Sequence, residues 1–152
     1  MYLWKIEELN EQLVKGTLPE SESFKYLMAS TVIYSLAMIQ YMTPNNYDTL
    51  SGFITLAVSV VGLWFIYKCN GGANGKYLLQ RYMSIGWVIL VRFIVILLIP
   101  TVIVLILVQA LVFGDVPEQT SLIDVVFMNV AEVVYILWVA KHINKVATQT
   151  SA

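Results

Sequence analysis

Four long stretches of this sequence carry almost no charge, and they limit the possible folds more than any other feature does. Residues 26–47, 49–67 and 93–114 contain no Asp, Glu, Lys or Arg, and residues 125–140 contain only Glu132. A helix rises about 1.5 Å per residue, so about 20 apolar residues cross a hydrocarbon core about 30 Å thick. We therefore predict four transmembrane helices, at approximately residues 25–43, 50–68, 82–113 and 122–141.

The composition agrees with a membrane protein and disagrees with a soluble helical bundle. Hydrophobic residues make up 59% of the 152 residues, charged residues make up 12%, and the mean hydropathy is +0.74. A soluble domain keeps about a quarter of its residues charged, and this chain has too few charges to cover such a surface. No basic patch or finger motif indicates nucleic-acid binding. The expected surroundings are therefore the lipid bilayer.

The lysines and arginines occupy alternate connecting segments. Three precede the first expected span, three lie between the second and third, two follow the fourth, and none lies in residues 43–50 or 114–121. Because cytoplasmic loops are enriched in these residues, both termini and the middle loop are expected in the cytoplasm. The first residues lack the apolar core and cleavage site of a secretory signal, and the outer loops are short. These features favour a bacterial cytoplasmic (inner) membrane.

Residues 1–23 are predicted to form an amphipathic segment at the membrane interface, with a helix over residues 2–15. Its apolar side chains recur at spacings of three and four, and its glutamates lie elsewhere. Gly16 is expected to end this helix. Its acidic face argues against binding to anionic lipid, so the helix lies on the inner leaflet or packs beneath the bundle. Residues 24–142 then form a four-helix bundle, and residues 143–152 form a short cytoplasmic tail.

The fourth expected helix has one polar face. At about 100° per residue, an arc of about 140° holds Asp124, Asn129, Glu132, Tyr135 and His142. Lipid excludes such a face, so it must turn toward other helices. Glu132 lies near the middle of the span, about 12 Å from either edge. Three roles stay open for it: a bond to neighbouring helices that fixes their packing, transport of protons or cations, or pairing with another membrane protein.

Two other expected helices carry polar groups that can reach Glu132. Arg92 is the other charged residue within a span. It either forms a salt bridge or shares a water site with Glu132, or it extends to the inner interface. Tyr34 of the first helix is a candidate hydrogen-bond donor to Glu132. The binding residues that we predict are Glu132, Arg92, Asn129, Tyr135 and Tyr34.

Two further features bear on how the helices pack. A stripe of small side chains on the second expected helix allows a neighbouring helix to approach closely; it consists of Ser51, Gly52, Thr55, Ser59 and Gly62. Pro100 removes a backbone hydrogen bond and is expected to kink the third helix.

Catalysis and metal binding have little support in the sequence. The chain has one cysteine, Cys69, and one histidine, His142, which provide neither a thiol pair nor a cluster of metal ligands. We expect no enzyme, no metal and no cofactor. Two function classes remain: a non-enzymatic accessory or immunity-type protein that recognises another membrane protein through its helices, or a homo-oligomeric channel or transporter subunit that uses Glu132 with Arg92.

Overall fold

Helices make up nearly all of the described chain. The computed structural model describes residues 2–37, 45–114 and 119–150, and no strand occurs within these ranges. The elements, in order, are α1 (Ile6–Lys15), α2 (Glu20–Ala37), α3 (Asn46–Cys69), the 3-10 turn η1 (Gly72–Asn74), α4 (Leu78–Phe93), the π-helical segment η2 (Ile94–Leu98), α5 (Ile99–Phe113) and α6 (Leu122–Thr150). The all-helical class that the sequence predicts is confirmed.

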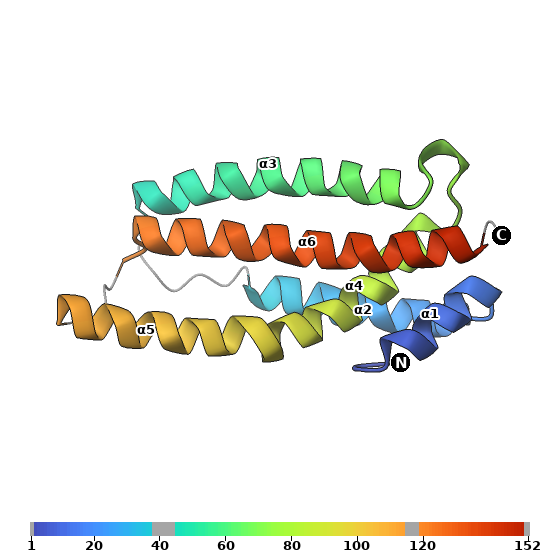
Figure 1. Cartoon of the computed structure of the whole chain (residues 1–152), viewed down its shortest axis with the longest axis horizontal. Coiled ribbons are helices and arrows are strands. Elements are labelled where there is room, and N and C mark those ends of the chain that lie inside the picture. The colour runs from blue at the N-terminus through green and yellow to red at the C-terminus, as the bar shows by residue number, and fades with distance from the viewer. Residues whose placement is uncertain (1, 38–44, 115–118, 151–152) are drawn as a thin grey trace.

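Three rods run along the long axis of the molecule (Figure 1): α3, α6, and the continuous rod of α4, η2 and α5. α3 packs along α6, α4 packs on α2 and α6, and α1 packs on α4 and α6. Helix α1, the loop that follows α3 and the last turns of α6 lie at the same end of the molecule. We call this end the charged end.

Three helices are long and apolar enough to cross a membrane, namely Asn46–Cys69, Leu78–Leu111 and Leu122–Gln149. They coincide with the second, third and fourth predicted spans. The first predicted span, 25–43, falls on α2, whose described part ends at Ala37; residues 38–44 lie outside the described residues. The count of four spans and the cytoplasmic position of both termini therefore stay predictions.

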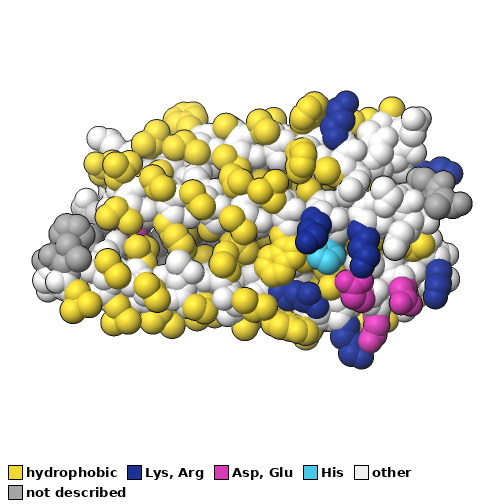
Figure 2. Space-filling view, in the orientation of Figure 1, with side chains coloured by type: hydrophobic (Ala, Val, Ile, Leu, Met, Phe, Trp, Pro, Cys, Tyr) yellow, Lys and Arg dark blue, Asp and Glu magenta, His cyan; other side chains and the backbone are white. Residues whose placement is uncertain are grey.

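The surface has the character that a bilayer requires. On the face in Figure 2, hydrophobic side chains cover most of the length, and charged side chains gather toward the charged end. Large apolar side chains are widely exposed: Phe53 of α3 exposes 70% of its surface and Leu111 of α5 exposes 84%. Soluble monomers rarely expose large continuous apolar patches. The exposed apolar rods are therefore consistent with an integral membrane protein.

Helix α1 confirms the amphipathic helix predicted near the N-terminus. Its apolar residues Ile6, Leu9 and Leu13 are buried, and Gly16 ends the helix in the left-handed conformation with φ +63°. A glycine adopts this conformation without the steric penalty of a side chain. The apolar face of α1 packs on α4 and α6.

The third span contains a π-helical turn beside Pro100. The segment Ile94–Leu98 is π-helical, and Pro100 stands at the start of α5. Proline has no backbone N–H, so the carbonyl of Ile96, four residues earlier, has no α-helical donor. A π-helical turn contains one extra residue. This residue makes room for the proline ring and shifts the hydrogen-bonding pattern around the carbonyl that has no α-helical donor. The kink expected at Pro100 stays a prediction, and the π-helical segment is what the structure has beside this proline.

Helix α6 is longer than the predicted fourth span. It continues through the predicted tail, 143–152, as far as Thr150. The reason is that Val139, Ile143 and Val146, spaced by four and three, are fully buried in the same cluster as the apolar residues of α1. This spacing places them on one face of a helix, so packing against α1 maintains the helix beyond the span.

Close packing between α3 and α6 depends on a glycine. Gly62 of α3 is buried, and a Cβ atom at this position would lie 2.5 Å from Cδ1 of Ile136 on α6. Two further carbons of the same isoleucine would lie at 3.1 and 3.2 Å. The whole Ile136 side chain occupies the space that any larger residue would need. The predicted stripe of small residues thus provides the contact between these two helices.

We predict that Gly62→Leu lowers the thermal stability of the purified protein in detergent, because inserting a side chain into a packed interface costs about 1–3 kcal/mol. The matched control is Gly52→Leu in the same helix, where a Cβ atom would have no neighbour within 4 Å. Leucine favours helix more than glycine does, so the control should melt at the wild-type temperature or above. Equal melting temperatures for the two variants would contradict this packing role.

Candidate functional site

Two residues of the polar face of α6 contact the small-residue stripe of α3. Ser59 Oγ donates a hydrogen bond of 2.6 Å to Glu132 Oε1, and Thr55 Oγ1 donates one of 3.3 Å to Asn129 Oδ1. Asn129 also donates through Nδ2 to the carbonyl of Val125, at 2.7 Å. The numbers of the paired residues rise together along the two helices, so α3 and α6 run parallel. Two predicted binding residues, Asn129 and Glu132, thus lie in one interface.

Tyr135 connects α6 to a different neighbour. Its hydroxyl donates to the backbone carbonyl of Gly86 on α4, at 3.2 Å, and its ring meets Phe93 edge-on with 5.9 Å between ring centroids. A Cβ atom at Gly86 would lie 3.1 Å from the tyrosine oxygen, so the absence of a side chain lets the hydroxyl reach the backbone. Tyr135 therefore joins α6 to α4, while Glu132 joins α6 to α3.

Arg92 contacts the N-terminal segment. Its Nη2 donates to the carbonyl of Trp4, and the centre of its guanidinium lies 5.4 Å from the centroid of the Trp4 ring. Such a cation–π contact is favourable, more so when it is shielded from water. Among the described ion pairs, none joins Arg92 to Glu132. The salt bridge expected between them is not formed, because Arg92 extends toward the charged end and Glu132 turns toward α3.

Tyr34 lies in the described helix α2, but its side chain lies outside the described residues. A hydrogen bond from Tyr34 to Glu132 stays a prediction.

The charged end contains a second set of polar contacts, between α1 and the last turns of α6. Asn10 Nδ2 lies 3.3 Å from His142 Nδ1, and Lys145 Nζ donates to Glu7 Oε2 at 2.6 Å. The hydrogen bond from Lys145 holds the pKa of Glu7 below its ordinary value. The sequence reasoning missed these partners, because they are more than 130 residues apart in the chain.

A third set of contacts closes the opposite end. Asn45 caps α3 and exchanges hydrogen bonds with Asp48, and its Nδ2 also donates to the carbonyl of Thr120, at 2.9 Å. Thr120 Oγ1 in turn donates to Asp48 Oδ1 at 2.6 Å. The spacing of Asn45 and Asp48 matches a capping box, so this local signal was available in the sequence. These bonds connect the start of α3 to the segment that leads into α6.

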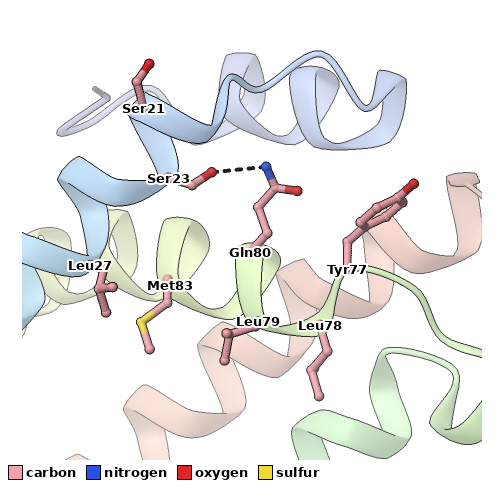
Figure 3. A pocket seen from close by; sticks show the side chains of 8 residues that line it. All are labelled: Ser21, Ser23, Leu27, Tyr77, Leu78, Leu79, Gln80 and Met83. Carbon is pink, nitrogen blue, oxygen red and sulfur yellow. Dashed lines mark hydrogen bonds between the residues drawn. The ribbon is translucent and has the colours of Figure 1, made fainter.

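The surface of the described chain also has hollows. One, of about 790 Å³, lies between the starts of α2 and α4 (Figure 3), where Gln80 Nε2 donates to Ser23 Oγ at 3.0 Å. Another is a groove of about 350 Å³ between α3 and α6, which we call the α3–α6 groove. Only apolar residues line it: Ala57, Val58, Val61, Gly62, Phe65, Val133, Ile136 and Leu137.

Comparisons of the chain with protein-family models, with curated proteins and with solved structures find no match. Any function must therefore be argued from the chain itself. Within the part of the chain that the structure describes, no three His, Cys, Asp or Glu side chains gather in a way that could hold a metal ion. The polar residues of the span interfaces form hydrogen bonds between helices, and this arrangement stabilises the packing of the bundle.

We predict a measurable energetic coupling between Ser59 and Glu132. In a double-mutant cycle with Ser59→Ala and Glu132→Ala, the coupling should be about 0.6 kcal/mol or more, which is typical of a hydrogen bond between membrane helices. The free energy of unfolding is measured by titration with a denaturing detergent. The control cycle pairs Ser51→Ala with Glu132→Ala. Ser51 lies about 12 Å from Ser59 along α3, so this cycle should show no coupling. Equal couplings in the two cycles would refute the bond.

Acid should loosen α1 from α6. Because the folded pKa of Glu7 is lowered, its bond with Lys145 stabilises the docked helix above the pKa of the unfolded carboxyl, about 4.3, and is lost as pH falls through the folded value. The two side chains are well exposed, so the effect stays below about 1 kcal/mol.

The measurement for the acid prediction is the fluorescence of Trp4 as a function of pH, in a protein whose other three tryptophans are replaced with phenylalanine. Glu7→Gln should remove part of the change that the wild type shows below about pH 4. Glu11→Gln should retain it, because Glu11 pairs with Lys15 within α1. If Glu7→Gln shows the same dependence of fluorescence on pH as the wild type, the bond between Glu7 and Lys145 does not hold α1 on α6.

Proposed function

We propose that this chain is a non-enzymatic integral membrane protein that recognises a transmembrane helix of another membrane protein. The observation that carries the proposal is the α3–α6 groove, about 350 Å³ of concave surface lined by apolar side chains alone. It lies on two of the helices that are apolar and long enough to cross a membrane. A groove of this kind accepts the apolar side chains of a helix that packs along it.

The shape of the α3–α6 groove is rigid. Val58, Val61 and Val133 are β-branched, and β-branched side chains in a helix adopt essentially one rotamer. Binding to a preformed surface requires little further ordering of side chains, which favours affinity. The contacts of Ser59 and Gly62 with α6 keep the two walls of the groove at a fixed separation. These features support recognition by shape, with the polar residues acting inside the chain.

The location that we propose is a bacterial inner membrane, with both termini in the cytoplasm. The distribution of lysine and arginine along the sequence supports this orientation. The gathering of charged side chains at the charged end, where α1 and the end of α6 lie together, is in keeping with it (Figure 2).

The alternative function is an oligomeric channel or transporter subunit that uses Glu132 with Arg92. It is favoured by the partly exposed carboxylate of Glu132 within a candidate span, because ionisable groups at such depth often mark ion pathways. Two contacts weigh against it. Glu132 accepts a bond from Ser59, and Arg92 contacts Trp4 at the charged end.

We predict that Val61→Trp prevents the copurification of a second membrane protein, because the indole fills the groove. The tagged protein is purified from its own host in mild detergent and analysed by native mass spectrometry. The matched control is Val60→Trp. Val60 and Val61 expose 60% and 64% of their surface, and only Val61 lines the groove. The control should retain the partner at wild-type stoichiometry.

Two outcomes would overturn the proposal. Equal retention of the partner by both tryptophan variants would show that the α3–α6 groove does not bind the partner. A homo-oligomer without a second protein, together with ion flux in liposomes that Glu132→Gln abolishes, would favour the channel class instead.

A further inference from the structure

A polar cavity of about 670 Å³ lies at the charged end, between the last turn of α3, the loop that follows it, the start of α4 and the end of α6. Its volume is in the range of small-molecule sites in proteins. Cationic side chains line it from three directions: Lys68 from α3, Lys76 from the loop and Arg81 from α4. Asn74, Asn144 and Thr148 add neutral polar groups. The proposed recognition of a partner helix does not involve this cavity.

The loop is built around a buried arginine. Arg81 exposes only 2% of its surface, and its Nη1 donates to Asn70 Oδ1 at 2.9 Å. Asn70, also buried, donates through Nδ2 to the carbonyl of Lys76 at 3.3 Å. A Cβ atom at Gly75 would lie 2.2 Å from the Asn70 carbonyl oxygen, so glycine allows the loop to close over Asn70. The loop that carries Lys76 therefore has a defined structure between α3 and α4.

The charge of the cavity is one-sided. Among the described residues that line it, none is acidic. The carboxylates of the described ion pairs lie on α1 and α2, on Glu7, Glu8, Glu11 and Glu22. Lys68 lies 5.5 Å from the ring centroid of Trp64, one turn earlier on α3. Tryptophan and lysine at the end of a span are typical of the level of the lipid headgroups.

We propose that this cavity binds a phosphate group, carried either by the headgroup of an anionic phospholipid or by a free phosphate ester. The exposed ammonium groups of Lys68 and Lys76 supply the positive charge that phosphate oxygens bind, and the buried guanidinium of Arg81 adds positive charge behind them. The side-chain amide groups of Asn74 and Asn144 supply further hydrogen-bond donors. A phosphodiester in the adjacent lipid leaflet and a soluble phosphate monoester present the same chemistry to these residues.

The test compares two double variants that remove equal charge. Lys68→Gln with Lys76→Gln changes two exposed side chains of the cavity and leaves the buried Arg81 in place. The control, Lys5→Gln with Lys15→Gln, changes two exposed lysines of the N-terminal region, outside the cavity. Each full-length protein is purified in a zwitterionic detergent. Binding of phosphatidylglycerol and phosphatidylcholine is measured by native mass spectrometry, and the effect of glycerol 3-phosphate on the melting temperature is measured against sodium chloride at equal ionic strength.

The two sources give different results. Retention of phosphatidylglycerol over phosphatidylcholine by wild type and control, weakened about tenfold or more in the cavity variant, would assign a lipid headgroup. A rise in melting temperature with glycerol 3-phosphate, absent from the cavity variant, would assign a free phosphate ester. Lipid binding and thermal response that are equal in the cavity and control variants would overturn the proposal.

Discussion

The pairing of α3 with α6 is the constraint on which the rest of the structure depends. Between two helices in lipid there is little hydrophobic driving force, because the lipid chains are as apolar as the side chains. Ser59 and Thr55 bond to Glu132 and Asn129, and the bare face of Gly62 accepts Ile136. Hydrogen bonds and close packing therefore act together at the same interface. α6 in turn contacts α4 and α1, so its position sets theirs.

Local signals in the sequence predict the rods well. The charge-free stretches identify three of the helices that can cross a membrane, and the spacing of Ile6, Leu9 and Leu13 identifies α1. These predictions succeed because each depends only on neighbouring residues. The length of α6 is underestimated for the opposite reason, since Ile143 and Val146 stay helical through contact with a segment from the other end of the chain.

Of the predicted binding residues, Asn129 and Glu132 lie together in the α3–α6 interface, whereas Arg92 and Tyr135 contact other segments. Glu132 and the stripe that contains Ser59 are both visible in the sequence, and their contact follows from the parallel arrangement of α3 and α6. Which residues of α3 face which residues of α6 depends on the path of the rod of α4, η2 and α5 between them. No local sequence pattern specifies this path. Arg92 shows the same limit: its partner Trp4 lies 88 residues away, and Glu132 is the natural choice only when depth in the membrane is considered alone.

The order of the helices along the chain also has a consequence for membrane insertion. α6 is the last helix of the described chain, and it carries the carboxylate whose transfer into lipid is most costly. When ribosomal synthesis delivers α6 to the membrane, α3 has already been made, with Ser59 in place to receive Glu132. Until then α3 exposes only small and hydroxyl side chains along its stripe, which lipid tolerates far better than a charge. The helix that donates the hydrogen bond, α3, is thus synthesised before α6, which carries the acid that is costly to transfer into lipid.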